Sequence, residues 1–226
     1  MEAGNIAGDI AGNLAAVHRR IEAALARAGR PSGGARLVAV SKTFPPEAIR
    51  EAYQAGQRDF GENRVQEFEG KRPELELEGA VWHLIGHLQS NKAARAAQLF
   101  HVIHSVDSIS LAGRLERAAS QRIPVLIEVK LSDEPAKSGV AESEVDQLAA
   151  AIRGMESLEL RGLMTIPPWS TDPEVARPYF RRLREIGRRL GVPELSMGMT
   201  NDFETAIEEG ATMVRVGTAI FGKRKV

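Results

Sequence analysis

Short apolar runs alternate along the chain with stretches whose apolar residues recur at a helical spacing. The run Leu37, Val38, Ala39, Val40 is continuous rather than alternating, which is typical of a strand buried on both faces. Strands are predicted at residues 36–43, 58–60, 81–85, 102–106, 124–131, 158–166, 194–196 and 213–216. Helices are predicted at residues 6–28, 46–55, 64–71, 91–100, 108–120, 140–153, 172–190 and 202–209.

The order of these elements predicts a parallel sheet. Eight strands that alternate with helices fit a closed barrel, since eight is the number of strands that closes one. The competing architecture, an open doubly wound sheet, should carry G-x-G-x-x-G after its first strand, and residues 41–45 read SKTFP instead. With no internal repeat and no linker, we predict an α/β fold. It is a single (β/α)8 TIM barrel over residues 1–226, with an additional helix at residues 1–30 packed on the barrel.

Composition narrows the classes of function. Lysine plus arginine and aspartate plus glutamate balance at 30 each, so the whole molecule has no general attraction for nucleic acid or an anionic membrane. Absence of cysteine excludes disulfides, thiolate metal sites and cysteine nucleophiles. The N-terminal residues do not resemble a signal peptide, and no run approaches the ~20 apolar residues of a membrane span. We therefore expect a cytoplasmic protein without nucleic-acid or membrane partners.

Lys42 is the first candidate for chemistry, because it stands where the apolar strand ends. An ammonium held against apolar walls has a lowered pKa, which leaves an amine able to attack a carbonyl and form a Schiff base. The alternative is a strand-end lysine whose stem packs while its charged head reaches water. The strand alone does not decide between them.

The other strand ends suggest what Lys42 would face. In a barrel the site lies at the carboxyl ends of the strands. Small residues, hydroxyls and glycines gather after the last two strands, where barrels commonly bind phosphate. Turn geometry alone could also explain these glycines. A ligand with a phosphate at one end and a carbonyl near Lys42 would fit this arrangement.

Seven motifs, each at a strand end, carry a family resemblance. They are LVAVSKT at 37–43, FGENRVQE at 60–67, WHLIGHLQSNK at 82–92, KSG at 137–139, RGLMTI at 161–166, LSMGMTNDFETAI at 195–207 and MVRVGTAIFGKR at 213–224. The chain closely resembles the pyridoxal 5'-phosphate homeostasis protein family, which is similar in fold to the barrel domain of bacterial alanine racemase. The resemblance implies a fold type III barrel that binds pyridoxal 5'-phosphate (PLP).

The resemblance also implies roles for single residues. Lys42 would form the Schiff base with the cofactor's aldehyde, and Arg215 would face the pyridine nitrogen. A cation there disfavours protonation of the ring and weakens it as an electron sink. The phosphate-binding set would be Ser196, Gly198, Thr200, Gly217 and Thr218, and the ring neighbours Asn63 and Met164. At Thr200 the family more often has serine, so the hydroxyl is kept and a methyl is added. No residue is assigned a catalytic role.

The same resemblance argues against a racemase. Racemisation by this fold needs a tyrosine as a second base, brought by a further domain and the partner subunit, and the only tyrosines here, Tyr53 and Tyr179, lie on predicted outer helices. The resemblance therefore implies a carrier or regulator of PLP, without established activity, that could pass the cofactor to apo-enzymes. We expect a monomer. Two alternatives stay open: a PLP-dependent amino-acid racemase or lyase, and a Schiff-base aldolase.

The remaining candidates carry weaker signals. His83 and His87 are four residues apart, a spacing that places two metal ligands on the same face only if the segment is a helix. Because His83 lies in a predicted strand, no metal site is expected. His101 and His104 fall on opposite faces of their strand and are interpreted as structural. Lys137 lies in a loop and is either a second docking amine for the aldehyde or an ordinary exposed lysine.

Overall fold

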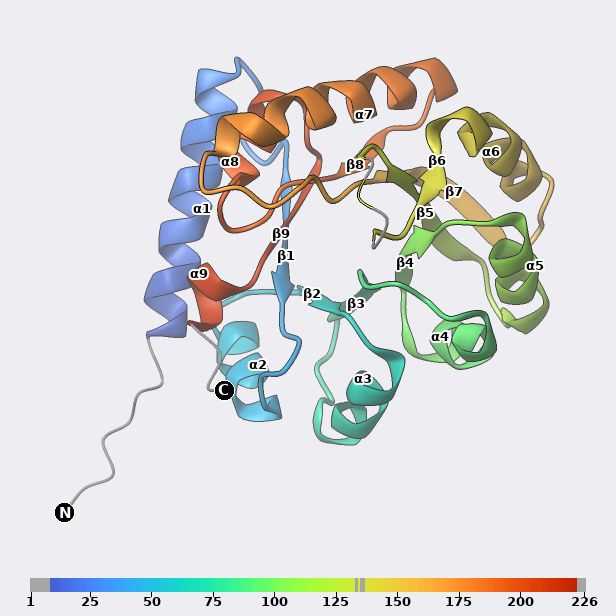
Figure 1. Cartoon of the computed structure of the whole chain (residues 1–226). Coiled ribbons are helices and arrows are strands. Elements are labelled where there is room, and N and C mark those ends of the chain that lie inside the picture. Colours follow the sequence, from blue (N-terminus) through green and yellow to red (C-terminus); the bar gives the residue numbers. More distant parts are fainter. Residues whose placement is uncertain (1–8, 133, 135–136, 223–226) are drawn as a thin grey trace.

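A computed structural model describes residues 9–132, 134 and 137–222 (Figure 1). Its strands are β1 (Arg36–Val40), β2 (Asp59–Glu62), β3 (Val81–Leu84), β4 (Val102–Val106), β5 (Ile123–Lys130), β6 (Val140–Ala141), β7 (Leu158–Met164), β8 (Glu194–Ser196) and β9 (Met213–Val216). Its helices are α1 (Ile10–Arg27), α2 (Pro46–Gln54), α3 (Val65–Lys71), α4 (Ala93–Leu99), α5 (Ile109–Ala118), α6 (Val145–Arg153), α7 (Arg177–Leu190), α8 (Phe203–Glu208) and α9 (Thr218–Phe221). Four short 3₁₀ helices are η1 (Arg72–Glu74), η2 (Ser90–Lys92), η3 (Glu142–Glu144) and η4 (Pro173–Ala176).

The strands form a closed parallel barrel. Neighbouring strands follow the order β4-β3-β2-β1-β9-β8-β7-β5, and a further pairing of β4 with β5 closes the ring. β6 pairs only with the end of β5 and stands outside the ring. In Figure 1 the helices surround the strands. The predicted TIM barrel is confirmed, while the prediction that residues 1–226 form one domain stays a prediction.

Two predicted helices begin differently in the structure. Residues 140–153 were expected to be helical throughout, but Val140 pairs with Val129 of β5 before a 3₁₀ turn leads into α6. Residues 172–190 likewise begin with the 3₁₀ turn η4, which Asp172 caps by accepting a hydrogen bond from the Glu174 N–H. Because 3₁₀ turns often precede α-helices, the hydrophobic pattern placed both starts too early.

The buried face of α7 also differs from the pattern. Apolar residues at positions 175, 179, 183, 186 and 190 recur at a helical spacing, whereas the structure buries Phe180, Leu183, Ile186 and Gly187 and leaves Val175 46% exposed. Val175 lies in η4, whose period is about three residues per turn, so it does not share the face of the helix that follows.

Two apolar cores hold the barrel. The larger lies between the strands and the helices and contains Phe60, Phe68 and Trp82. The Trp82 ring stacks on Phe60 with centroids 5.2 Å apart and meets the Phe68 ring at a tilt with centroids 4.6 Å apart. The smaller contains Val102, Leu126, Met164 and Met213, with Val81 and Ile166 packed against it. Because successive strand residues point alternately outward and inward, this second cluster fills the barrel interior.

Helix α1 packs on the last part of the barrel. Asp9 caps it by accepting a hydrogen bond from the Gly12 N–H, and its apolar stripe from Ile10 to Leu25 is buried; Ile6 lies outside the described residues. Asn13 donates to the Ile220 carbonyl of α9 at 2.9 Å, and Arg20 pairs with Glu204 of α8 at 2.8 Å. Helix α1 thereby holds the two helices that follow β8 and β9. Within the described ranges, no helix combines the length and apolarity that crossing a membrane requires.

Candidate functional site

Lys42 stands two residues beyond β1, and the chain around it is held by side chains of β2 and α3. Ser41 is fully buried, and its hydroxyl donates to Glu62 at 2.7 Å. The Thr43 N–H donates to the Glu67 carboxylate at 2.5 Å. Thr43 has φ = 67°, a left-handed conformation that costs a β-branched residue energy. These contacts hold the main chain on both sides of Lys42.

Glu62, Glu67 and Lys71 together form what we call the Lys71 clamp. The Lys71 ammonium donates to Glu67 at 2.5 Å, to the Ser41 carbonyl at 3.2 Å and to Glu62 at 3.3 Å. The Glu62 side chain has no exposed surface, and burial raises its pKa against the opposing effect of Lys71. The clamp therefore joins one fully buried carboxylate to a partly exposed ammonium and a partly exposed second carboxylate, and the buried Glu62 depends on its cation.

Two strands along the barrel from β1, Gly198 shapes the loop after β8. Its φ of +93° is left-handed, and a Cβ there would lie 2.6 Å from the Ala206 Cβ of α8. The Arg215 N–H donates to the Gly198 carbonyl at 2.9 Å, which ties this loop to β9. The Asp202 carboxylate accepts from the Met199 N–H at 2.6 Å. Only glycine fits this turn over the start of α8.

The strand register places Lys42 and Gly217 on the same rim. Ala39 of β1 pairs with Val216 of β9, so Gly217 and Lys42 both lie just beyond these neighbouring strand ends. Gly217 caps the short helix α9, and Thr218 begins it with an exposed side chain. Thr200, on the loop after β8, is half-buried. Lys42, Gly198, Thr200, Gly217 and Thr218 therefore come from three neighbouring strand ends, as the sequence predicted.

Arg215 and Ser196 lie deeper, inside the barrel. The Arg215 guanidinium donates to the Ser196 hydroxyl at 2.6 Å and to the Thr165 carbonyl at 2.9 Å. Burial lowers the pKa of Arg215 to about 10, against the opposing charges of Asp202 and Glu128. Ser196 is fully buried, so the structure places it beside Arg215 rather than among the rim residues Thr200 and Thr218.

The two predicted ring neighbours occupy different depths. Asn63 follows β2 and is half-buried, and its carbonyl lies so close to Gly86 that a Cβ on Gly86 would be 2.3 Å from it. Met164 is fully buried in the barrel interior, where it pairs in register with Ser196 and Glu128. The loop after β2 therefore brings Asn63 to the barrel mouth, and the end of β7 places Met164 at the floor of the mouth.

Glu128 is a candidate that the sequence interpretation missed. It is 5% exposed, and its Oε2 atom has no hydrogen-bond partner among the described residues. Burial and then the neighbouring Asp107 raise its pKa to about 7, while Arg215 opposes the shift. The sequence PVLIEVKL does contain a clue, because Glu128 is two residues from Leu126 and therefore also points into the barrel. A single acidic residue in an apolar strand, however, does not indicate which residue it would interact with.

The histidines are arranged differently from a metal site. His83 Nδ1 lies 2.9 Å from His104 Nε2 inside the barrel, whereas His87 is exposed with Nδ1 3.5 Å from Asp107. Across the part of the chain that the structure describes, no group of three or more histidine and acidic side chains could hold a metal ion. His101 accepts from the Trp82 N–H on the outside of the barrel.

Lys137 lies near the mouth and is engaged by neighbours. Its ammonium pairs with Glu134 at 2.6 Å and donates to the Ile166 carbonyl, just after β7, at 3.2 Å. The role of Lys137 as a second docking amine stays a prediction.

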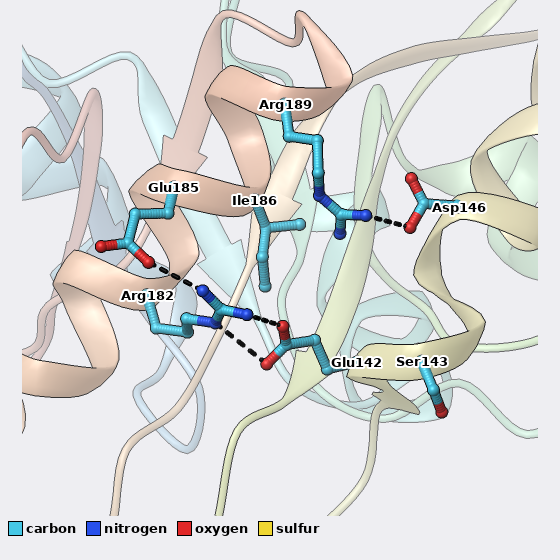
Figure 2. Close-up of a pocket in the computed structure, with 7 residues that line it drawn as sticks. All are labelled: Glu142, Ser143, Asp146, Arg182, Glu185, Ile186 and Arg189. Carbon is cyan, nitrogen blue, oxygen red and sulfur yellow. Dashed lines mark hydrogen bonds and ion pairs between the residues drawn. The ribbon is translucent and has the colours of Figure 1, made fainter.

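A pocket of about 630 Å³ lies elsewhere, between α6 and α7 (Figure 2). Arg182 pairs there with Glu142 and with Glu185, and Arg189 pairs with Asp146. Ile186 lies between these pairs in the close-up. Because both arginines that line this pocket are already paired with carboxylates, we do not assign a ligand to it.

The closed barrel belongs to a class that includes the N-terminal domain of alanine racemase. Residues 12–225 match the family described as alanine racemase, N-terminal domain. The barrel also superposes on an alanine racemase from Corynebacterium glutamicum with a TM-score of 0.66 at 20% identity, covering 96% of this chain and 62% of that one. At that identity the likeness concerns the fold.

Nearer relatives define the family within this class. The chain is 45% identical to a pyridoxal phosphate homeostasis protein of Aquifex aeolicus over 94% of this chain and 97% of that protein. It is 46% identical to one of Pseudomonas aeruginosa over 95% and 96%. It superposes on PipY of Synechococcus elongatus, solved with PLP bound, with a TM-score of 0.81 at 40% identity, covering 94% of this chain and 100% of that one. The chain belongs to the pyridoxal phosphate homeostasis protein family.

Proposed function

We propose that this chain binds PLP at the barrel mouth and serves as a carrier in PLP homeostasis. Lys42 would hold the aldehyde as a Schiff base: its amine adds to the aldehyde carbon and displaces the oxygen as water. The rim residues Gly198, Thr200, Gly217 and Thr218 would receive the phosphate, and Arg215 would face the pyridine nitrogen. The observation that carries the proposal is the placement of Lys42 beside Gly217 on one rim, above the buried Arg215.

The residues present fit such a cofactor. When bound, PLP supplies an aldehyde and an aromatic ring that can accept electrons. Gly198 and Gly217 keep side-chain atoms away from the rim, and the first N–H groups of α9 have no partners within their helix, as at any helix start. The buried guanidinium of Arg215 donates hydrogen bonds and accepts none, so it would favour an unprotonated ring nitrogen. The structure of PipY with PLP bound supports PLP as the ligand of this chain.

The arrangement of tyrosines supports a carrier rather than a racemase. Tyr53 lies on α2, where its hydroxyl donates to the Glu78 carbonyl at 2.9 Å, and Tyr179 lies on α7. Both helices belong to the outer layer in Figure 1, and the chain has no other tyrosine. A second base opposite Lys42 would have to be another kind of residue. The names of the relatives, as homeostasis proteins, support the same proposal.

The proposal is tested by titrating the purified chain with PLP and recording its absorption spectrum. Lys42→Ala should lose the absorption band of the Schiff base and bind PLP on the order of 100-fold more weakly, because the covalent link is gone. Lys137→Ala is the matched control, since Lys137 is a second lysine near the mouth, with its ammonium 3.2 Å from the Ile166 carbonyl just after β7. An unchanged spectrum and affinity in Lys42→Ala would show the assignment to be wrong.

The carrier role needs a separate experiment. The loaded chain is mixed with a PLP-dependent apo-enzyme, and the recovered activity is compared with that from an equal amount of free PLP. Recovery at least as fast as from free PLP is expected of a carrier. Exchange of an amino acid's α-hydrogen with deuterated water, lost in Lys42→Ala, would favour the racemase alternative instead.

A further inference from the structure

A continuous line of hydrogen bonds crosses the barrel interior below the mouth. Asp59 Oδ1 lies 2.9 Å from His83 Nε2, His83 Nδ1 lies 2.9 Å from His104 Nε2, and His104 Nδ1 lies 2.9 Å from the Ser196 hydroxyl. The Ser196 hydroxyl in turn accepts from Arg215 at 2.6 Å. The line therefore runs from the start of β2 through β3, β4 and β8 to β9.

Donor and acceptor rules give this line one direction. The Asp59 carboxylate only accepts, so His83 donates through Nε2, and a neutral His83 is left with a bare Nδ1. This Nδ1 accepts from His104 Nε2–H, which leaves His104 Nδ1 bare as well. The Ser196 hydroxyl must then give its proton to His104 Nδ1. Its oxygen is left to accept from Arg215, so every group has a partner.

The opposite direction needs an extra buried proton. If His104 donated to Ser196 through Nδ1, its Nε2 would have to accept from His83 Nδ1, and His83 would have to be a cation to donate to Asp59 as well. The charged and titratable groups near His83 and His104 are Asp59, His101 on the outside of the barrel, and Arg215. Arg36 lies 3.8 Å from Asp59. Burial, His83 and Arg215 lower the pKa of His104 well below its usual value, which agrees with a neutral His104.

We propose that Asp59, His83 and His104 are positioning residues, which commit the Ser196 hydroxyl proton to His104 and so make Ser196 a pure acceptor that orients the Arg215 guanidinium. The consequence for Ser196 is specific. Its proton is engaged inside the barrel, so it serves the cofactor by fixing Arg215 and not by donating its hydroxyl to the phosphate. The direction of the hydrogen bonds does not depend on the proposed function. Only the effect on cofactor binding through Arg215 rests on it.

The hydrogen-bond direction can be tested without any ligand. Long-range proton–nitrogen NMR spectra of the apo-protein at neutral pH report which ring nitrogen of each of the five histidines carries the proton. His83→Gln and His104→Asn assign the two signals. We expect both rings to be neutral with the proton on Nε2. A proton on Nδ1 of either ring would overturn the proposal.

The effect on Arg215 is tested with two variants of similar size. His104→Asn keeps an acceptor near the Nδ1 position, whereas His104→Leu removes it. The probe is pyridoxine 5'-phosphate, which has the ring nitrogen and the phosphate but no aldehyde, with inorganic phosphate as the second probe. His104→Leu should weaken pyridoxine phosphate binding about tenfold, the effect of one hydrogen bond, and leave phosphate binding unchanged. His104→Asn should stay within about threefold of the wild type.

The controls separate this inference from the proposed function. His101→Gln, outside the line, should change neither affinity. Equal losses in His104→Leu and His104→Asn would mean that His104 acts by packing alone, and would overturn the positioning role. If the wild-type chain fails to bind PLP, the proposed function fails, while the histidine tautomers of the apo-protein still decide whether the hydrogen-bond line runs as proposed.

Discussion

The two sides of the barrel mouth are held by different kinds of interaction. On the β1–β2 side, the chain around Lys42 is held by the Lys71 clamp, in which charged side chains meet in a nearly dry environment. On the β8–β9 side, the loop at Gly198 is held by main-chain hydrogen bonds and by close approach to α8. The first side depends on charge and the second on backbone shape.

This difference explains how each side can fail. A buried ion pair loses far more when one partner is removed than it gains from being present, because the other charge is left unpaired. A left-handed glycine in contact with a neighbouring helix fails when any side chain is added. Each of the following predictions tests one side against a matched position elsewhere in the chain.

The largest effect is expected at Gly198. In Gly198→Val, the new side chain begins 2.6 Å from the Ala206 Cβ, and φ is +93°, so the loop and α8 must both move. We expect a loss of more than about 3 kcal/mol in the free energy of unfolding. The measurement is urea denaturation, with Gly191→Val as the control. Gly191 is also left-handed, with φ = 66° but open space around it, so only the conformational cost of about 1–2 kcal/mol is expected. Equal losses at the two positions would mean that the contact with α8 is unimportant.

The charge-built side is tested by Lys71→Met. This change leaves Glu62 buried without its cation, and we expect a loss of about 3 kcal/mol in the free energy of unfolding. Adding Glu62→Gln to Lys71→Met should recover part of the loss, because the unpaired charge disappears. An additive double variant would contradict the coupling between these residues.

An exposed ion pair gives the scale for that result. The Arg95 and Glu69 side chains are 44% and 43% exposed and pair at 2.7 Å. Arg95→Met should therefore cost less than about 1 kcal/mol in the same experiment. If Arg95→Met and Lys71→Met cost the same, burial does not distinguish the clamp from a surface pair.

Glu128, a buried residue of β5, makes the free energy of unfolding depend on pH. Its pKa is about 7 in the folded protein against 4.5 for the free side chain, so the folded state holds a proton that the unfolded state has already released. The stability tied to this proton is complete below about pH 4.5 and is lost as the pH rises through about 7. Relative to Glu128→Gln, the wild type should lose roughly 2 kcal/mol between about pH 5 and pH 8. The measurement is the free energy of unfolding of both proteins at several pH values, and parallel curves would contradict the shift.

Much of the fold follows from local pattern. The strands predicted at residues 102–106, 194–196 and 213–216 agree with the structure to the residue. Ser108 stands at the start of the helix predicted at residues 108–120, and its hydroxyl accepts from the Leu111 N–H, as serine commonly does at a helix N-cap. The pairing of Val140 with β5 depends on a partner ten or more residues away, so local pattern could not predict it.

The candidate site likewise contains residues that the sequence could predict and residues that it could not. Lys42, Gly198 and Gly217 were predictable because strand ends in a barrel meet at one rim. The Lys71 clamp and Glu128 were not, since each depends on which side chains from separate strands meet in the interior. His104 shows the limit most clearly. Its parity on the strand predicted a structural residue, and only the three-dimensional structure joins it to His83 and Ser196.

The most direct test of the account is the position of the cofactor on the chain. The PLP-loaded protein is reduced with sodium borohydride, which fixes a Schiff base as a stable amine, and is then digested and analysed by mass spectrometry. A single cofactor is expected on the peptide that contains Lys42, and no fixed cofactor in Lys42→Ala. Fixation at Lys137, at several lysines or at none, with Lys42 unmodified, would contradict it.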